Sequence, residues 1–256
     1  MTSLSPTQRF SDRVANYVRY RPSYPAECLA ILEKETTLSP SSFVADVGSG
    51  TGLSAELLLR SGGVVYGVEP NLEMRGAAEQ FLAGQARFHS VNGTAEATTL
   101  ADQSVTHVSA AQAFHWFNPE ETRREFRRIL KPGGWVILLW NARHLDTTPF
   151  LREYEELILR YGTDYGTVRH ENINQEALER FYGKGSFTQR RVPNSQTFDL
   201  AGVTGRLLSS SYAPPPGDSR HGPMLQDLAK IFSSHEVNGK VSFDYDTQIY
   251  WGTLDP

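Results

Sequence analysis

The sequence predicts an α/β fold built around a parallel β-sheet, and three observations lead to this prediction. Between residues 43 and 140, short apolar runs alternate with segments of helical periodicity, as in strand, helix, strand units. A glycine-rich segment follows the first apolar run directly, where such a unit turns from strand to helix. Residues 243–249 alternate apolar and polar side chains, which indicates a half-buried antiparallel strand near the C-terminus.

Five apolar runs are short enough to be buried strands, and a sixth candidate strand follows later in the chain. These segments are residues 43–47, 64–68, 86–90, 105–111, 135–140 and 187–192. Leu53 and Leu57 lie at helical spacing between the first two runs. Asn118, Pro119 and Glu121 predict the start of another helix, because they combine a side-chain cap, a proline at the first helical position and a carboxylate three residues after the cap.

The composition is that of an ordinary globular protein, with 39% hydrophobic and 21% charged residues in a chain long enough to bury a full core. The net charge of -4 gives no reason to expect a nucleic-acid partner, because such proteins usually carry a basic excess. Cys28 is the single cysteine, so no intramolecular disulfide and no thiolate cluster can form. We expect no metal site and a reducing, cytoplasmic setting.

The chain is expected to form one domain, residues 1–256, without a membrane partner. Its longest strongly apolar run, residues 135–140, is too short to span a bilayer, and residues 1–10 do not resemble a signal peptide. The expected parts are an N-terminal cap (1–39), a core (about 40–145), lid insertions (about 145–185 and 199–240) and C-terminal strands (186–198 and 241–252). The oligomeric state is not predicted.

The glycine-rich segment, residues 46–52, is the strongest signal in the chain. Gly48, Gly50 and Gly52 allow positive φ angles and lack Cβ atoms, so the backbone can touch a ligand. We expect free backbone N–H groups at this helix start to attract an anionic group of a nucleotide-like cofactor. The alternative is a tight strand-to-helix turn that needs glycine only for its geometry.

Glu69 ends the second apolar run, where a carboxylate can accept hydrogen bonds from both hydroxyls of a ribose. The alternative is a residue beside a helix start, before Pro70. An NAD-binding site would use the same acid. However, the G-x-G-x-G spacing places the third glycine one residue earlier than in the dinucleotide pattern G-x-G-x-x-G, which argues against NAD.

Five short segments form a set of motifs along the chain. They are residues 46–52, Glu69, residues 93–96 after the third strand, residues 111–117 after the fourth and residues 130–134 before the fifth. With these motifs the sequence resembles the class I S-adenosylmethionine-dependent methyltransferases, particularly the type 11 methyltransferases. It looks closest to the enzymes that methylate trans-aconitate and quinone precursors. The resemblance covers roughly residues 10–145 well and the terminal strand more weakly.

The resemblance implies a Rossmann-like, seven-stranded, mostly parallel sheet with helices on both faces and an antiparallel last strand between the fifth and the sixth. It also implies S-adenosyl-L-methionine as the cofactor. Gly48 and Gly50 would line its methionine part, Gln112 would face the methionine end, and Ala95 with Glu96 would lie beside the adenine. The full implied set is Arg21, Asp46, Gly48, Ser49, Gly50, Glu69, Ala95, Glu96 and Gln112.

Arg21 belongs to an N-terminal segment, residues 17–25, that often folds over the cofactor in this family. Its guanidinium would pair with the cofactor carboxylate, and a surface ion pair is the alternative. His115 and Trp116 follow the fourth strand and are the candidate catalytic residues. His115 would act as a general base and Trp116 would shield the sulfonium, and the alternative is a packed aromatic corner.

The predicted function is methyl transfer to an oxygen, a carboxylate or a carbon of a small molecule. The alternatives are an NAD-dependent oxidoreductase on a similar sheet and a cofactor-binding protein without turnover. Residues 199–240 are far longer than a connection between antiparallel strands requires, so we expect a lid that governs the methyl acceptor, with Tyr212 shaping its pocket. An acidic acceptor is suggested by the cations Arg169, His170, Arg206 and His221.

Overall fold

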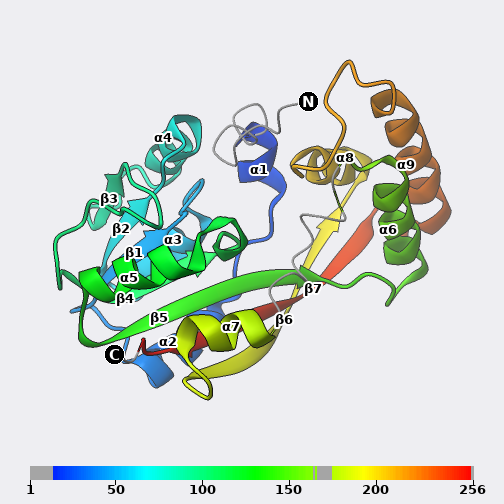
Figure 1. Cartoon of the computed structure of the whole chain (residues 1–256). Helices are drawn as coiled ribbons and strands as arrows, with labels where there is room; N and C mark the ends of the chain where they lie inside the picture. The colour runs from blue at the N-terminus through cyan, green and yellow to red at the C-terminus, as the bar shows by residue number, and fades with distance from the viewer. Residues whose placement is uncertain (1–13, 164, 166–174, 255–256) are drawn as a thin grey trace.

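The computed structural model describes residues 14–163, 165 and 175–254, so Arg169 and His170 lie outside the described residues. Within it, seven strands form one sheet in the order β3-β2-β1-β4-β5-β7-β6 (Figure 1). The strands are β1 (Phe43–Val47), β2 (Val64–Val68), β3 (Phe88–Val91), β4 (Val105–Ala111), β5 (Leu130–Arg143), β6 (Phe187–Phe198) and β7 (Val241–Gly252). β7 runs antiparallel between β5 and β6, which confirms the expected sheet.

Helices flank both faces of this sheet. The described helices are α1 (Val14–Tyr20), α2 (Ala26–Thr36), α3 (Leu53–Leu59), α4 (Leu72–Phe81), α5 (Pro119–Ile129), α6 (Pro149–Tyr161), α7 (Gln175–Tyr182), α8 (Leu200–Leu208) and α9 (His221–His235). The predicted cap of α5 is confirmed, because the Asn118 side chain accepts hydrogen bonds from the N–H groups of Glu120 and Glu121. Asn71 caps α4 in the same way through the N–H of Met74, a signal that the sequence analysis did not use.

Two strands are longer than their apolar runs indicated. β5 was expected at residues 135–140 and β6 at residues 187–192, but both continue with polar residues at their carboxyl ends. β7 pairs with β5 as far as Arg143 and with β6 as far as Phe198. Hydrogen bonds to a long partner strand therefore extend these strands beyond their buried parts. At its start β5 bulges, since its pairing with β4 moves from Leu130 directly to Trp135.

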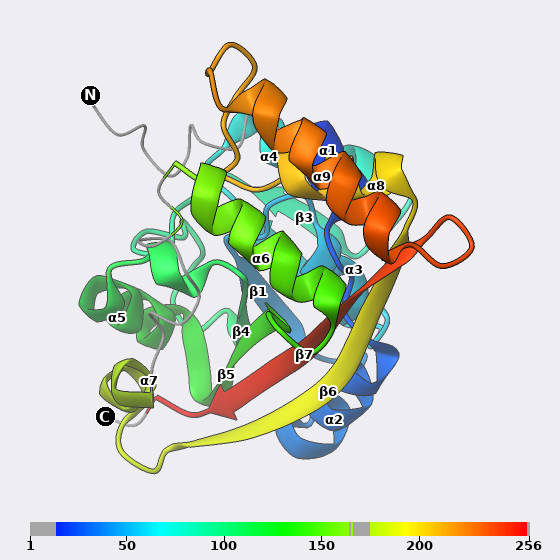
Figure 2. The same cartoon turned by 90° about the vertical axis from the view of Figure 1, so that its right-hand side faces the viewer.

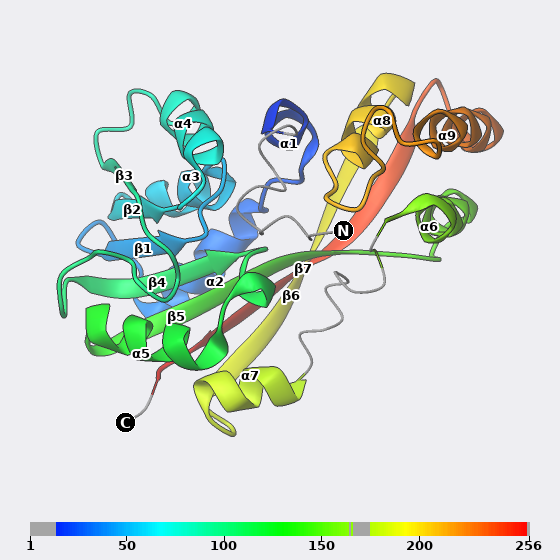
Figure 3. The same cartoon turned by 45° about the horizontal axis from the view of Figure 1, so that its top comes forward.

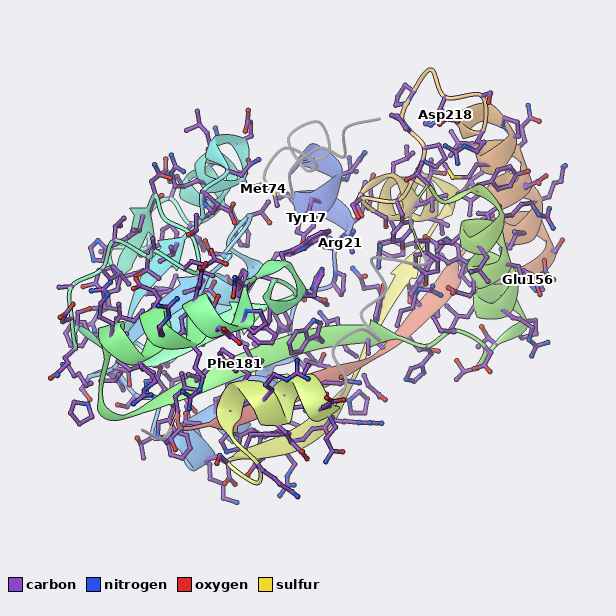
Figure 4. All side chains as sticks on the ribbon, in the orientation of Figure 1. Tyr17, Arg21, Met74, Glu156, Phe181 and Asp218 are labelled. Carbon is purple, nitrogen blue, oxygen red and sulfur yellow. The ribbon has the colours of Figure 1, made fainter. Side chains whose placement is uncertain are left out.

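The sheet buries a separate hydrophobic cluster on each face. Ala45 and Val47 of β1 point to the cluster that includes Phe126 of α5 and Phe181 of α7. Val44 of the same strand points to the opposite cluster, with the apolar residues of α2 and α3. Alternation along the strand thus separates the two faces, as expected for a pleated sheet covered on both sides. Figure 4 shows Phe181 between α7 and the sheet.

β5, β6 and β7 extend past the parallel core and carry a third hydrophobic cluster. This cluster joins α6, α8 and α9 to the far end of β7, with the Phe243 ring at its centre. α6 and α9 lie side by side across this end of the sheet (Figure 2). α1 contacts α4 on the core side and α8 on the other side, so it connects the core with the extension (Figure 3).

The contact between α1 and α8 is unusually close at Gly205. A Cβ atom added at this glycine would lie 2.0 Å from the Tyr20 ring. Glycine costs stability in a helix interior, where alanine is favoured by about 0.5–1 kcal/mol. The close approach of the Tyr20 ring explains why glycine stands at this position in α8.

We therefore predict that Gly205→Ala destabilises the protein by roughly 1–3 kcal/mol, because overpacking outweighs the gain in helix propensity. Gly76→Ala in α4 is the matched control, since a Cβ at Gly76 meets nothing within 4 Å. That variant should gain about 0.5–1 kcal/mol. Urea unfolding of both variants checks the signs, and stabilisation by Gly205→Ala would contradict the packing described.

Candidate functional site

One cavity lies at the carboxyl ends of β1 and β4, the edge where parallel sheets bind ligands. It brings together most of the residues that the sequence predicted for the site: Arg21, Gly48, Ser49, Gly50, Gln112, His115 and Trp116. Other parts of its wall come from Tyr17, Asn141, Arg143, Tyr165, Arg206 and Tyr212. In Figure 4, Tyr17 on α1 and Arg21 directly after it lie between the core that carries Met74 and the helices of the extension.

The glycine-rich loop has the backbone that only glycine adopts easily. Gly48, Gly50 and Gly52 have φ angles of 67°, 54° and 88°. A Cβ at Gly48 would lie 2.6 Å from the Cβ of Ala113, and the Phe117 ring packs beneath the same glycine. The loop therefore needs glycine both for its turn and for its approach to the end of β4.

Three N–H groups at the beginning of this loop are used within the protein. The N–H groups of Gly48 and Ser49 donate to the Val68 carbonyl at 2.8 and 3.2 Å, and that of Gly50 donates to Glu69 Oε2 at 3.0 Å. The reason is that β1 and β2 are adjacent parallel strands, so the loop after β1 meets the end of β2. These three N–H groups are therefore not available to a ligand, and the expected role of the N–H groups at the start of α3 stays a prediction.

Glu69 connects the loop to the start of α4. Its two carboxylate oxygens accept one backbone N–H each, from Gly50 at 3.0 Å and from Asn71 at 2.9 Å. Burial raises the pKa of Glu69, although these two hydrogen bonds act in the opposite direction. Each carboxylate oxygen keeps a further lone pair that can accept a hydroxyl hydrogen.

Asp46 is fully buried beneath the loop. Its Oδ2 accepts a hydrogen bond from Ser54 Oγ at 2.7 Å. Burial raises the pKa of Asp46 to about 7, against the effect of the Ser54 hydrogen bond. Asp46 does not line the cavity, so it supports the loop from below.

Gln112 stands at the end of β4 in a left-handed backbone conformation, with φ at 57°. A residue other than glycine adopts this conformation at a cost of roughly 1–3 kcal/mol, and such strain is common at functional sites. Its side-chain Nε2 donates to the Asn141 carbonyl at 3.3 Å, whereas its buried Oε1 has no partner within the described part of the chain. Gln112 lines the cavity, so its Oε1 is a buried acceptor close to the cavity wall.

His115 and Trp116 follow in a short 3₁₀ helix, Phe114–Trp116, with their ring centroids 4.7 Å apart. Burial lowers the pKa of His115 to about 4, so its imidazole is neutral near pH 7. The hypothesis of a general base and that of a packed aromatic corner both fit this geometry.

Three arginines line the cavity: Arg21, Arg143 and Arg206. Arg21 donates to the Ser209 carbonyl at 2.9 Å and lies over the Tyr17 ring. Burial lowers the pKa of Arg21, and the positive charge of Arg206 lowers it further. Arg143 forms a buried ion pair with Glu155, which also accepts a hydrogen bond from the Tyr165 hydroxyl.

Asn141 is a site residue that the sequence analysis missed. Its Nδ2 donates to the carbonyls of Pro22 and Ser23, both at 3.3 Å, and its Oδ1 accepts from Thr247 Oγ1 at 2.5 Å. It therefore ties the N-terminal segment to the sheet. Asn141 and Arg143 follow the fifth apolar run, and polar residues at the carboxyl end of a parallel strand were the signal that could have found them.

Ala95 and Glu96 lie outside this cavity. Ala95 is buried in the core cluster that also contains Val68. Glu96 Oε1 accepts a hydrogen bond from the Asn118 N–H at 2.9 Å, at the start of α5. Their expected place beside an adenine stays a prediction.

Comparison with known proteins identifies the family. A family described as a methyltransferase domain matches residues 45–138. A methyltransferase-like protein of Schizosaccharomyces pombe is 32% identical over 96% of both chains. The chain belongs to the class I S-adenosylmethionine-dependent methyltransferases. This membership decides against the NAD-dependent oxidoreductase that the sequence alone left open.

Solved methyltransferase structures share the fold. A putative type II methyltransferase of Anaeromyxobacter dehalogenans has a TM-score of 0.65 and 20% identity, over 93% of this chain and 99% of its own. A Haemonchus contortus N-methyltransferase, solved in complex with phosphomonomethylethanolamine and S-adenosylhomocysteine, has a TM-score of 0.59 and 14% identity, over all of this chain and 61% of its own.

The described residues of the methyltransferase were compared with the requirements of a metal site and of a membrane-spanning helix. There, no three or more His, Cys, Asp or Glu side chains are grouped so that they could hold a metal ion. In the same part of the chain, no helix is both long enough and apolar enough to cross a bilayer.

Asp46 predicts a pH dependence of the enzyme's stability. Its pKa rises from 3.8 to about 7 on folding, so between these values the folded state keeps a proton that the unfolded state has lost. The free energy of unfolding therefore carries a penalty that is absent near pH 4 and reaches on the order of 4 kcal/mol near pH 7. Asp46→Asn removes this penalty and should gain stability relative to the wild type as the pH rises.

Urea unfolding of Asp46→Asn and wild type, each at pH 4.5 and pH 7, measures this difference. The comparison is made at each pH because His115 acts in the opposite direction. Its pKa falls from 6.5 to about 4 on folding, so its contribution is present above pH 6.5 and is lost as the pH falls toward 4. A difference between the two proteins that does not change with pH would mean that Asp46 stays ionised in the fold.

Proposed function

We propose that this methyltransferase transfers a methyl group from S-adenosylmethionine to an oxygen, a carboxylate or a carbon of a small molecule bound in the same cavity. One observation carries the proposal. The cavity joins the glycine-rich loop and Gln112 of the core to Arg206 and Tyr212 of the excursion between β6 and β7. One side of the cavity thus has the features of a cofactor site, and the other is available for an acceptor.

The cofactor-binding residues present fit S-adenosylmethionine. Gly48 and Gly50 would let its methionine part approach the backbone, and Glu69 would accept both ribose hydroxyls with its remaining lone pairs. Arg21 would pair with the carboxylate, since its Nε has no hydrogen-bond partner within the described residues. Gln112 Oε1 would accept from the cofactor's ammonium group. The Haemonchus contortus protein, which shares the fold, was solved with the demethylated cofactor.

The bound cofactor supplies a methyl group that is already electrophilic because the sulfur is a sulfonium. The residues of this chain would therefore act mainly by aligning the acceptor and excluding water. Trp116 would cover the reacting groups. His115, with a pKa of about 4, is a weak base at pH 7, so its main role would be to position the acceptor.

Binding of S-adenosylhomocysteine tests the cofactor site. Glu69→Ala should lose roughly a hundredfold in affinity, because two ribose hydrogen bonds are worth on the order of 3 kcal/mol. Glu79→Ala is the control, since Glu79 is exposed on α4. Calorimetry measures both variants, and unchanged affinity in Glu69→Ala would remove Glu69 from the site. Thermal unfolding should respond to S-adenosylhomocysteine and not to NAD.

Turnover tests the roles of His115 and Trp116. We expect His115→Ala and Trp116→Ala to keep S-adenosylhomocysteine affinity within about threefold but to slow methylation by about tenfold or more, because in the proposed site both residues would face the reacting groups rather than the cofactor's anchors. A panel of carboxylic and hydroxylated metabolites, assayed with methyl-labelled cofactor, identifies an acceptor for this measurement. Full turnover in both variants would favour the packed aromatic corner, and a panel without any methylated member would contradict the proposed acceptor class.

A further inference from the structure

Arg206 is a buried cation that faces the cavity. Only 5% of its surface is exposed, although it lies on α8 near the surface of the molecule. Its Nε donates to the Tyr245 hydroxyl and its Nη1 donates to Ser210 Oγ, both at 3.3 Å. No carboxylate among the described residues forms an ion pair with it. A buried charge whose partners among the described residues are hydroxyl groups is costly, so its retention calls for an explanation.

Arg21 approaches the same hydroxyl. Its Nη2 lies 3.5 Å from Ser210 Oγ, and within the described residues it also has no carboxylate partner. Two guanidinium groups therefore converge on one side chain, and their repulsion disfavours this arrangement unless an anion lies between or beside them. Arg143 differs, because Glu155 neutralises it.

The proposed cofactor neutralises only one of these two cations. Its carboxylate would pair with Arg21, but its ammonium and sulfonium groups bring two positive charges of their own. Binding of the cofactor therefore makes the cavity more positive. Arg206, which has no carboxylate partner among the described residues, would still lack an anion when the cofactor site is filled.

We propose that Arg206 binds an anionic group of the methyl acceptor, a carboxylate or a phosphate. This inference rests on the proposed function and names the acceptor class. A guanidinium has five N–H donors, of which two are used by Tyr245 and Ser210, so others remain for an anion. Tyr212 also lines the cavity, and its hydroxyl would be a further donor for the same anion.

A purely structural role explains Arg206 less well. A neutral donor or an apolar side chain would hold α8 against Tyr245 without the cost of burying a charge. Arg220, on the same excursion, illustrates the ordinary case: it is 43% exposed and pairs with Asp218 at 2.7 Å. Arg220 thus already has an anionic partner, whereas Arg206 has none among the described residues.

The test uses the full chain saturated with S-adenosylhomocysteine, so that Arg21 is occupied. Succinate, methyl phosphate and the neutral succinamide are titrated by calorimetry at constant ionic strength. We expect at least one anion to bind about tenfold or more tightly than succinamide. Tighter binding of succinate would indicate that the acceptor group is a carboxylate, and tighter binding of methyl phosphate would indicate a phosphate.

Variants locate the effect. Arg206→Met should lose about tenfold or more in anion affinity while S-adenosylhomocysteine affinity stays within about threefold, and Arg206→Lys should retain part of the anion affinity. Arg21→Met should show the opposite pattern: its affinity for S-adenosylhomocysteine should fall more than its affinity for the anion. Arg220→Met is the control and should match the wild type. If Arg206→Met does not fold, as judged by circular dichroism, Arg206→Gln keeps a donor for Tyr245 and carries the same expectation.

Equal anion affinity in the wild type and Arg206→Met would overturn the inference, and so would a wild type that binds succinamide as tightly as the anions. Neither outcome affects the proposed cofactor site. A wild-type protein that does not bind S-adenosylhomocysteine would instead contradict the proposed function, and with it the acceptor class inferred from it.

Discussion

The antiparallel insertion of β7 between β5 and β6 is the constraint on which the site depends. This ladder continues beyond the parallel core and supports α6, α8 and α9 through a hydrophobic cluster of their own. Without the extension, the cavity at the carboxyl edge of the sheet would keep its glycine-rich loop but lose the wall that Arg206 and Tyr212 form. The residues that α8 and its following turn place in the cavity, Arg206 and Tyr212, owe their location to this strand order.

The N-terminal segment links the two halves of the cavity. Asn141 of β5 holds the carbonyls of Pro22 and Ser23, and Arg21 donates to the carbonyl of Ser209 beyond α8. Residues proposed to hold the cofactor therefore depend on the excursion between β6 and β7. For this reason, single side chains such as Arg206 separate acceptor binding from cofactor binding more cleanly than removal of residues 199–240 would.

The charges in the cavity favour a mechanism of positioning. Arg206 is a buried cation and Arg21 a partly buried one, while burial keeps His115 neutral near pH 7. Such a site attracts and orients an anion but offers no strong base. An acceptor whose nucleophilic atom is already ionised needs no proton removed, so the electrostatics and the proposed chemistry agree.

The sequence by itself determined the parallel core, the glycine turn and the place of Glu69 at the end of the second strand, because buried parallel strands are continuous apolar runs whose ends must meet at one edge. The bounds of β1, β2 and β4 follow directly from such runs. Only the tertiary structure decided which distant segments contact the parallel core and complete the cavity. The extra length of β5 and β6 depends on β7, and the loop N–H groups are used by Val68 and Glu69. Arg21 and Ser209 are 188 residues apart in the chain, and local sequence patterns carry no information about a contact made by packing distant elements together.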